Sequence, residues 1–248
     1  MIICLRPQPD CGSDVAELTR RAVQAVALPM LQVAYLPAPL VLSSSAGRQS
    51  FYKGIIITSK QASRYLAEHA DVSPEMRRLP VWSVGAGSSE ILRQVGFEIA
   101  YTGNGSAADL ADQICQQGAS EPLLWFSGRD VHLDMAARLN GQGITVNRQV
   151  VYHTDALLTP YQAVQDHLMS AKPAAVIIFS ARTLTQFRLW LAEYVPAAKP
   201  AQLTVLAASF GLAKQAREAG FLALQADSPD RQAVLHLSVC WFQQKFVK

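Results

Sequence analysis

The sequence is poor in charge and in cysteine, and it has no long uninterrupted apolar run. Charged residues are 17% of the 248 positions while half are hydrophobic, a balance that excludes a disordered chain and predicts well-buried cores. The net charge of +3 slightly favours an acidic partner, but the basic stripe typical of nucleic-acid binding is missing. The most apolar stretch, 26–42, contains Pro29, Pro37 and Pro39 and is shorter than the ~20 apolar residues that span a bilayer.

No targeting pattern is recognisable near the first residue, because Arg6 and Pro7 come too early for the apolar segment of a secretory signal. We therefore expect a cytoplasmic protein that neither enters a membrane nor binds nucleic acid. The length allows two domains of ordinary size.

The few cysteines do not form a metal or disulfide pattern. They include no CxxC pair and have no histidine at the spacing of a zinc site. Two of them lie in apolar runs, where a buried free thiol is the usual state. The sequence therefore predicts no metal site at Cys4, Cys11, Cys115 or Cys240.

Short apolar runs alternate with amphipathic segments over almost the whole chain. Several runs, such as 55–57 and 176–179, are continuous, which is typical of parallel strands buried on both faces. Two helical segments end directly before Gly96 and Gly220, as helices commonly do. This pattern predicts an α/β fold with parallel sheets. We expect strands at 2–5, 31–35, 54–58, 81–84, 98–101, 123–126, 146–153, 175–179, 203–207 and 223–225, and helices at 13–26, 61–70, 88–95, 107–116, 133–140, 161–169, 183–193, 212–219 and 231–243.

The chain contains an internal repeat. Residues 83–97 and 207–221 both read as strand, tight turn, helix and a Gly-Phe pair, and the two pairs are separated by 124 positions (220 minus 96). Upstream, 55–60 matches 176–181, and 31–35 matches 148–152, at similar separations. Three matches at nearly one spacing predict that the same α/β unit occurs twice.

The third repeat pair predicts where the chain passes between two lobes. Its segments are extended and end at Tyr35 and Tyr152. If both are crossovers, one lobe is discontinuous: lobe one comprises 1–34 and 154–248, lobe two comprises 38–149, and the crossovers 35–37 and 150–153 form a hinge. The alternative is two consecutive domains with one linker, which would leave the first strand of each lobe beside the wrong neighbours.

Turns after the expected strands are rich in small and hydroxyl residues. Backbone N–H groups are free at the carboxyl edge of a parallel sheet, and a hydroxyl adds a donor without a full charge. Taken one at a time, such residues usually cap helices. As a set facing one cleft, in two copies, they predict a polyanion site formed by Thr58, Ser59, Gly85, Ser88, Ser127, Ser180 and Ser209.

Familiar site motifs are missing from these turns. Gly85-x-Gly87 lacks the third glycine and the acidic residue of a dinucleotide fingerprint, and no P-loop pattern occurs. Neither Ser59 nor Ser127 lies in a G-x-S-x-G elbow, which argues against a hydrolase.

Three side chains near the turns could act on an acidic substrate. Arg6 and Arg129 follow strands and could steer carboxylates, and a solvated surface role fits their positions equally well. Tyr152 lies at an expected crossover, where an un-ionised phenol (reference pKa about 10) can donate a proton to a departing oxygen. The alternative is that Tyr152 packs across the hinge like Tyr35.

The order of these motifs resembles the uroporphyrinogen-III synthase family over essentially the whole chain. Each motif is short, so the specificity lies in the ensemble and in the discontinuous lobe. The motifs are the strand entering Arg6-Pro7, the Thr58-Ser59 turn, the 84–88 turn, the Gly128 loop, the 149–152 crossover, Phe179-Ser180 and the turn before Leu212.

The resemblance implies two flavodoxin-like lobes joined by a two-stranded ladder, and a monomeric lyase of porphyrin and heme biosynthesis that works without metal or cofactor. It implies that hydroxymethylbilane, an acidic linear tetrapyrrole, loses its hydroxyl to give an azafulvene, and that ring D is inverted through a spiro intermediate to give uroporphyrinogen III. Tyr152 is then the catalytic group that assists hydroxide departure, and Thr58, Ser59, Ser88 and Ser180 hold carboxylate arms.

The chain departs from the family pattern in lobe one. Ser209 and Leu212 stand where glycine and threonine are usual, and Leu5 stands where a threonine often precedes Arg-Pro. The missing threonine leaves open a rival function, in which a bilobal protein kept the fold for small-molecule binding or regulation without the activity. Solute-binding proteins with two lobes are normally exported, and no signal is recognisable here.

Overall fold

The computed structural model describes residues 1–37, 51–170 and 172–246, and these form two compact units. Unit 1 is Met1–Gln32 with Asp155–Lys248, and unit 2 is Val33–Thr154. Two strands carry the chain from one unit to the other, β3 (Leu31–Tyr35) and β8 (Val146–Ala156). Residues 38–50, with which the expected lobe two begins, lie outside the described residues.

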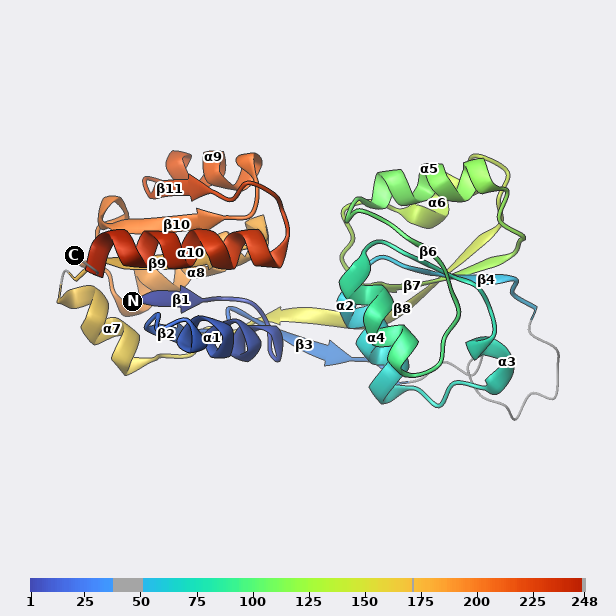
Figure 1. The fold of residues 1–248 in the computed structure, drawn as a ribbon, viewed down its shortest axis with the longest axis horizontal. Coiled ribbons are helices and arrows are strands. Elements are labelled where there is room, and N and C mark those ends of the chain that lie inside the picture. The colour runs from blue at the N-terminus through green and yellow to red at the C-terminus, as the bar shows by residue number, and fades with distance from the viewer. Residues whose placement is uncertain (38–50, 171, 247–248) are drawn as a thin grey trace. The chain divides into compact units, whose positions relative to one another are not determined.

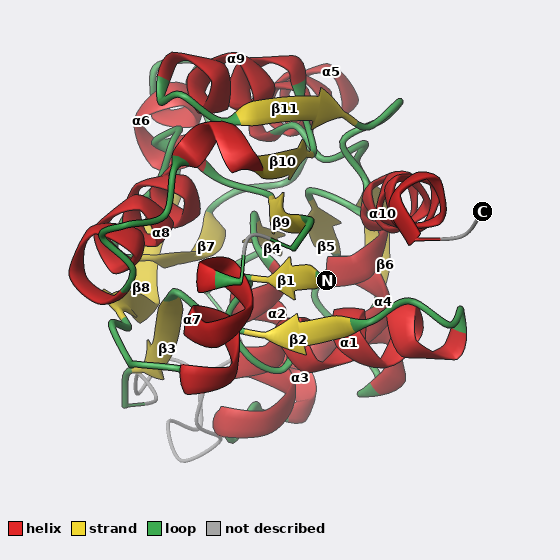
Figure 2. Cartoon of the chain, turned by 90° about the vertical axis from the view of Figure 1, so that its left-hand side faces the viewer, coloured by secondary structure: helices red, strands yellow, loops and turns green. Residues whose placement is uncertain are grey.

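Unit 1 contains a parallel sheet in the spatial order β2-β1-β9-β10-β11. In chain order this is 2-1-3-4-5, the flavodoxin-like arrangement. Figure 2 shows these strands as one stack, from β11 at the top to β2. Their bounds are β1 (Ile2–Cys4), β2 (Ala25–Ala27), β9 (Ala174–Ile178), β10 (Leu203–Ala207) and β11 (Leu222–Gln225).

Helices cover both faces of this sheet, which explains its continuous apolar strands. Ile2 and Cys4 of β1 belong to the core beneath α1 and α10, whereas Ile3 belongs to the core beneath α7, α8 and α9. Figure 2 shows α8 and α10 on opposite sides of the strands. The bounds are α1 (Asp10–Arg20), α7 (Gln162–Met169), α8 (Ala181–Tyr194), α9 (Phe210–Glu218), α10 (Arg231–Phe246) and the short 3₁₀ helix η4 (Pro200–Gln202).

Unit 2 contains a six-stranded sheet in the order β3-β8-β7-β4-β5-β6, and the pairs from β8 to β6 are parallel. One face packs against α2, α3 and α4, and the other against α5 and α6 (Figure 1). The strand bounds are β4 (Gly54–Ile57), β5 (Val81–Ser83), β6 (Ile99–Thr102) and β7 (Leu123–Gly128). The helix bounds are α2 (Lys60–Arg64), the π-helical turn η3 (Tyr65–His69), α3 (Pro74–Arg77), α4 (Ala86–Gln94), α5 (Ala107–Gln117) and α6 (Met135–Asn140).

The internal repeat of the sequence is also a repeat of structure. The order β8-β7-β4-β5-β6 in unit 2 repeats β2-β1-β9-β10-β11 in unit 1. The matched segments 55–60 and 176–181 contain the ends of β4 and β9, which are third in each order. The segments 83–97 and 207–221 begin at the ends of β5 and β10, which are fourth. The α/β prediction with parallel sheets is therefore confirmed.

The two crossover strands run antiparallel to one another. In unit 2, Leu36 N–H donates to the Val151 carbonyl at 2.9 Å. In unit 1, Leu157 N–H donates to the Met30 carbonyl, also at 2.9 Å. Both residue pairs have the same sum of positions, as an antiparallel ladder requires.

Two local predictions are wrong. The expected helix 13–26 ends at Arg20, and its last residues instead form the edge strand β2. The chain turns at Ala22, whose φ is +58°, and the Val23 N–H donates to Leu18 O at 3.0 Å. The helix was predicted too long because the apolar residues of the edge strand continue the helical spacing of the apolar residues before them. The short helix α3, capped by the Ser73 hydroxyl, was missing from the expected elements.

Candidate active site

The expected site residues of unit 2 lie on, or directly after, four strands that are neighbours in the sheet. Tyr152 lies on β8, Ser127 ends β7 with Gly128, Thr58 and Ser59 follow β4, and Gly85 follows β5. Because parallel strands present their carboxyl ends at one edge, these residues share that edge. Sequence positions almost a hundred residues apart are thus brought together.

Tyr152 and Ser59 are in direct contact at this edge. The Tyr152 hydroxyl donates to Ser59 Oγ at 3.0 Å. Ser59 Oγ also accepts from the Ala62 N–H at 3.1 Å, which caps the N-terminus of α2. Since both bonds use the serine oxygen as acceptor, the Ser59 O–H remains available as a donor.

The Tyr152 ring packs directly against the backbone of Gly128. The two residues are opposite one another in the β7–β8 pairing. A Cβ atom on Gly128 would lie 2.6 Å from Tyr152 Cζ, so only glycine fits at this point of β7. On the next residue, the Arg129 N–H donates to the Tyr152 carbonyl at 2.9 Å. The tyrosine is therefore held at its ring, its hydroxyl and its backbone.

The Tyr152 phenol is kept in its protonated form. Burial is the main cause that raises its pKa above the ordinary value of 10, and the negative charge of Asp130 adds to the effect. The hydrogen bond with Ser59 acts in the opposite direction and is smaller than the burial effect. At neutral pH the side chain is consequently a donor.

Thr58 and Ser127 are linked to residues that the sequence did not single out. The Trp125 indole N–H donates to Thr58 Oγ1 at 3.0 Å. Ser127 is fully buried, donates to the Gly128 carbonyl at 3.0 Å and accepts from Arg148 Nε at 2.8 Å. The Ser127 hydroxyl is thus engaged inside the protein. Arg148, four residues before Tyr152, lies in the repeat segment 148–152 but was not recognised as a site residue.

The turn after β5 opens the helix α4. Gly85 is its N-cap residue, and Ser88 is buried in the first turn, where its N–H donates to the Gly85 carbonyl at 3.0 Å. The side chain of Lys60, another residue missed from the sequence, lies against Gly87 of this turn: a Cβ there would be 2.2 Å from Lys60 Cε. The lysine side chain and the N-terminus of α4 therefore lie next to each other.

Arg129 provides an exposed cation beside Tyr152. Its side chain has no ion-pair or hydrogen-bond partner within the described ranges. This position is suited to attracting an acidic ligand to the strand ends.

The expected residues of unit 1 also follow neighbouring strands, namely β9 and β10. Ser180 caps α8 by accepting from the Thr183 N–H at 3.2 Å, and its hydroxyl lies 2.8 Å from Thr183 Oγ1. Ser209 caps α9 by accepting from the Leu212 N–H at 3.4 Å. The Leu212 side chain packs against the apolar cores on both sides of the sheet.

Arg6 follows β1 and is held by carboxylates of its own unit. Its guanidinium contacts Asp10 at 2.8 Å and Asp14 at 3.2 Å, and its Cζ lies 4.9 Å from the centre of the Phe179 ring. Asp14 is fully buried and also binds Arg231 of α10 at 2.6 Å. The charge of Arg6 is therefore balanced within unit 1, and it is not a free surface cation.

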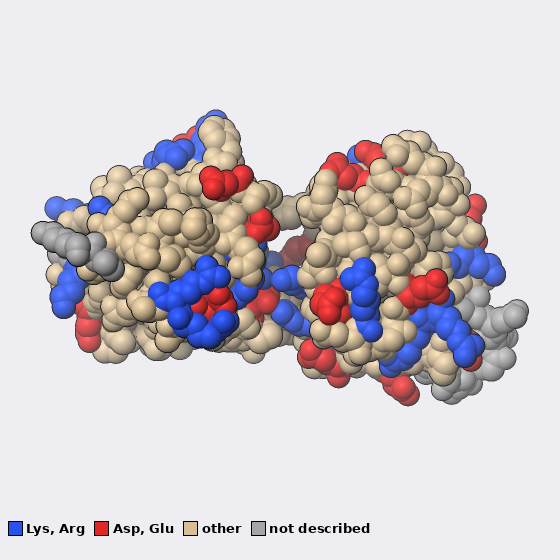
Figure 3. Space-filling model, in the orientation of Figure 1, with Lys and Arg blue, Asp and Glu red and all other residues tan. Residues whose placement is uncertain are grey.

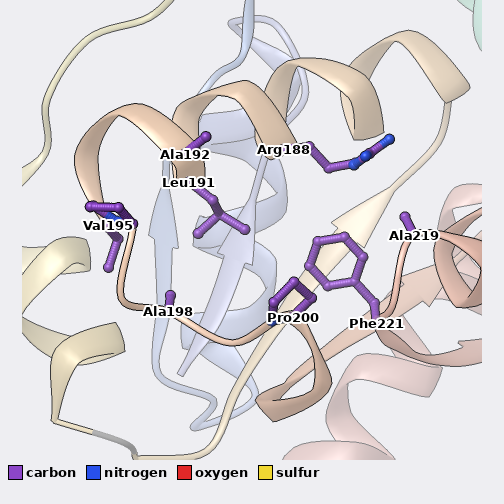
Figure 4. A pocket seen from close by; sticks show the side chains of 9 residues that line it. Arg188, Leu191, Ala192, Val195, Ala198, Pro200, Ala219 and Phe221 are labelled. Carbon is purple, nitrogen blue, oxygen red and sulfur yellow. The ribbon is translucent and has the colours of Figure 1, made fainter.

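A cavity of about 220 Å³ lies elsewhere in unit 1. It is bordered by the last turns of α8, by Pro200 of η4 and by the 219–221 segment before β11, so it lies at the amino-terminal edge of the sheet. Figure 4 shows Leu191 and Phe221 at this cavity, with Arg188 reaching across from α8. None of the expected site residues lines it.

Charges of both signs are interspersed on the face shown in Figure 3. Over residues 1–37, 51–170 and 172–246, no group of three or more histidine, cysteine, aspartate or glutamate side chains is arranged to hold a metal ion. None of the described helices combines the length and the apolar character needed to cross a membrane.

The fold and the site define a class: an α/β protein with two flavodoxin-like units, crossover strands and a partly buried tyrosine among hydroxyl and amide donors. The chain matches the family model described as uroporphyrinogen-III synthase HemD over residues 13–236, well over half of its length. The chain belongs to the uroporphyrinogen-III synthase family. It is thus an enzyme of the lyase class, with a function in porphyrin and heme biosynthesis.

Solved structures support the fold assignment. The uroporphyrinogen-III synthetase of Helicobacter pylori is similar with a TM-score of 0.66 and 17% identity, over 97% of this chain and 98% of that chain. A mutant uroporphyrinogen III synthase of the extremely thermophilic bacterium Thermus thermophilus is similar with a TM-score of 0.54 and 13% identity, over 99% of each chain. At such identities the likeness shows that the fold is shared.

Proposed function

We propose that this chain converts hydroxymethylbilane to uroporphyrinogen III, with Tyr152 as the catalytic group. The Tyr152 phenol donates its proton to the departing hydroxyl of the substrate, which leaves as water and gives the azafulvene in its protonated, cationic form. The substituted carbon of ring D attacks the azafulvene to form a spiro intermediate, which fragments and closes again with ring D inverted. Loss of a proton on final aromatisation returns the proton to the tyrosinate, so the enzyme ends unchanged.

The observation that carries this proposal is the environment of Tyr152. Its pKa is raised by burial, so the phenol is intact at neutral pH, and its hydroxyl already lies 3.0 Å from Ser59 Oγ. A group that must give up a proton and later recover it benefits from a high pKa, because its conjugate base is a strong proton acceptor. Ser59 stabilises the phenolate that forms by turning its O–H toward it.

The proposal assigns the carboxylate arms of the substrate to neutral donors. In unit 2 these are the Thr58, Ser59 and Ser88 hydroxyls and the N–H group of Gly85, with Arg129 as the attracting cation. In unit 1 they are the donors at Ser180 and Ser209, while Arg6 positions the end of β1. Such donors orient a flexible substrate without strong acids or bases, and orientation alone can supply a large part of a rate enhancement.

In this proposal Ser127 helps to position the site, because its hydroxyl is hydrogen-bonded to Gly128 and Arg148.

We further propose that the protein acts as a cytoplasmic monomer that binds no nucleic acid. It needs no cofactor, since each step requires only proton transfer and orientation of the substrate.

The test is the isomer composition of the product. Purified protein is mixed with hydroxymethylbilane that is generated enzymatically in the same tube, and the oxidised porphyrins are separated by chromatography. Unassisted cyclisation gives isomer I, so we expect isomer III to predominate and to increase with protein concentration. Isomer I alone would contradict the proposal and would favour the rival function, a fold that binds or regulates without catalysis.

A further inference from the structure

We infer that Arg148 is a positioning residue for Tyr152, and that it acts through the loop at the end of β7. Arg148 lies on β8, four residues before Tyr152; it begins the repeat segment 148–152 but was not among the expected site residues. The inference deepens the proposed function and rests on it for its kinetic part.

The guanidinium of Arg148 connects three consecutive residues. Its Nε donates to Ser127 Oγ at 2.8 Å, and its Nη2 donates to the Gly128 carbonyl at 2.7 Å and to the Arg129 carbonyl at 2.8 Å. Two carbonyl groups that accept hydrogen bonds from the same guanidinium group cannot rotate independently, so Arg148 fixes the backbone of this loop.

The same loop holds Tyr152. Gly128 packs against the phenol ring, and the Arg129 N–H donates to the Tyr152 carbonyl. The pairing of β7 with β8 is irregular between Ser127 and Gly128, so the regular ladder does not set the position of Gly128 by itself. Arg148 supplies the missing restraint at this irregular point.

A second line of contacts leads from Arg148 to the hydroxyl of Tyr152. The guanidinium carbon lies 5.0 Å from the centre of the Trp125 ring, whose N–H donates to Thr58 Oγ1. The next residue, Ser59, accepts from the Tyr152 hydroxyl. The contacts therefore form a closed circuit that begins and ends at Arg148, and the ring and the hydroxyl of Tyr152 are both held by it.

The structure also indicates whether Arg148 affects Tyr152 through its contacts or through its charge. Asp130 is the charged group that affects the Tyr152 pKa, and the main cause of its raised value is burial. Arg148 should therefore act by keeping water away from the ring and the hydroxyl in place. Lysine keeps the charge, but its compact ammonium group cannot reproduce the planar, spread donors of a guanidinium that reach Ser127, Gly128 and Arg129 together, so Arg148→Lys should behave like Arg148→Met.

The experiment is a double-mutant cycle with Tyr152→Phe, read as kcat in the hydroxymethylbilane assay. We expect Arg148→Met and Arg148→Lys to lower kcat by about 10- to 100-fold in the wild-type background. In the Tyr152→Phe background the same changes should lower kcat by less than about twofold, because the hydroxyl on which Arg148 acts is absent. Arg138→Met is the matched control: Arg138 binds exposed Asp112 in the same unit, and its loss should leave kcat unchanged.

A titration tests the inference independently of turnover. Tyrosinate absorbance is followed against pH for each Arg148 variant with and without Tyr152→Phe, and the difference isolates Tyr152. We expect its pKa to shift down toward the ordinary value of about 10 in both Arg148 variants and to stay raised in Arg138→Met. Circular dichroism identifies folded variants, and Arg148→Lys serves if Arg148→Met is unfolded.

The outcomes distinguish the two proposals. If no isomer III is formed but the Tyr152 titration shifts, the proposed function fails while the positioning role stands. An unshifted titration, equal losses of kcat in both backgrounds, or full rescue by lysine would each overturn the role of Arg148.

Discussion

Gly128 and Tyr152 lie so close that the ring of the tyrosine occupies the space where any other residue at 128 would place its Cβ. The nearest ring atom, Cζ, would be 2.6 Å from that Cβ, and the hydroxyl oxygen 2.9 Å. The contact involves backbone on one side and a restrained ring on the other, so neither partner can move without cost. The glycine is thus a requirement of the site, although its φ is ordinary.

The first prediction follows from this contact. Gly128→Ala should push the Tyr152 ring away and break its bond with Ser59, which should lower kcat by about 100-fold. The same change should destabilise the fold by about 1–3 kcal/mol through overpacking. Activity assays and urea unfolding measure the two effects.

Gly211→Ala is the matched control for that experiment. Gly211 lies in α9, and a Cβ there would meet nothing within 4 Å. Alanine should therefore leave kcat unchanged and stabilise the helix by about 0.5–1 kcal/mol. Equal effects of the two substitutions would contradict the importance of the Gly128 contact.

The second prediction concerns the phenol itself. Tyr152→Phe removes the proton donor and leaves the ring in place, so we expect kcat to fall by roughly 100-fold with little change in the midpoint of thermal unfolding. Tyr35→Phe is the comparison, because Tyr35 is the repeat partner and its hydroxyl donates to Gln61 Oε1 at 2.9 Å. Tyr35→Phe should keep its activity. Should both variants be equally active, Tyr152 would have a packing role like that of Tyr35.

The third prediction is a dependence on alkaline pH. Burial raises the Tyr152 pKa above 10, so the un-ionised phenol is stabilised in the folded state. The un-ionised phenol contributes fully to the stability of the fold below the unfolded-state pKa of about 10. This contribution is lost as the pH rises through the higher pKa of the folded state. The alkaline decline in kcat should accordingly lie above pH ~10 and should disappear in Tyr152→Phe, where residual turnover is measured against pH. A decline centred well below the ordinary tyrosine pKa would exclude Tyr152 as its source.

The sequence predicted the architecture better than it predicted the site. Continuous apolar runs such as 55–57 clearly indicate buried parallel strands. The repeat of 83–97 at 207–221 correctly matched two strands that occupy the same position in the two sheets. The edge strand β2 was missed, because three apolar residues next to a helix carry no period of their own.

The sequence indicates candidate site residues only where they belong to a local turn. Ser59 and Ser180 were recognisable as hydroxyls after strands, and each does cap the helix that follows. Arg148 and Trp125 could not be found in this way, because they act through contacts across strands whose register the sequence does not encode. Arg6 was predicted either to steer carboxylates or to be a solvated surface residue, whereas it binds Asp10, the first residue of α1, and Asp14, one turn further along that helix.

The last prediction concerns Asp14, which joins two arginines inside unit 1. Its carboxylate is fully buried and binds Arg6 from the end of β1 and Arg231 from the start of α10. Asp14→Asn keeps the size of the side chain but leaves two cationic side chains without their shared counter-charge. Removing one partner of a buried ion pair costs about 3 kcal/mol or more, so we expect a clear loss of stability in urea unfolding.

The control for Asp14→Asn is Asp112→Asn, which removes an exposed partner of Arg138 and should cost at most about 1 kcal/mol. Asp14→Asn should also raise KM more than it lowers kcat, because Arg6 beside Phe179 would keep Asp10 as its one carboxylate partner and be less firmly held, while Tyr152 lies in the other unit. A variant as stable as the wild type would mean that Arg6 and Arg231 find water or other acceptors at no cost, and the ion-pair cluster would then have no structural role.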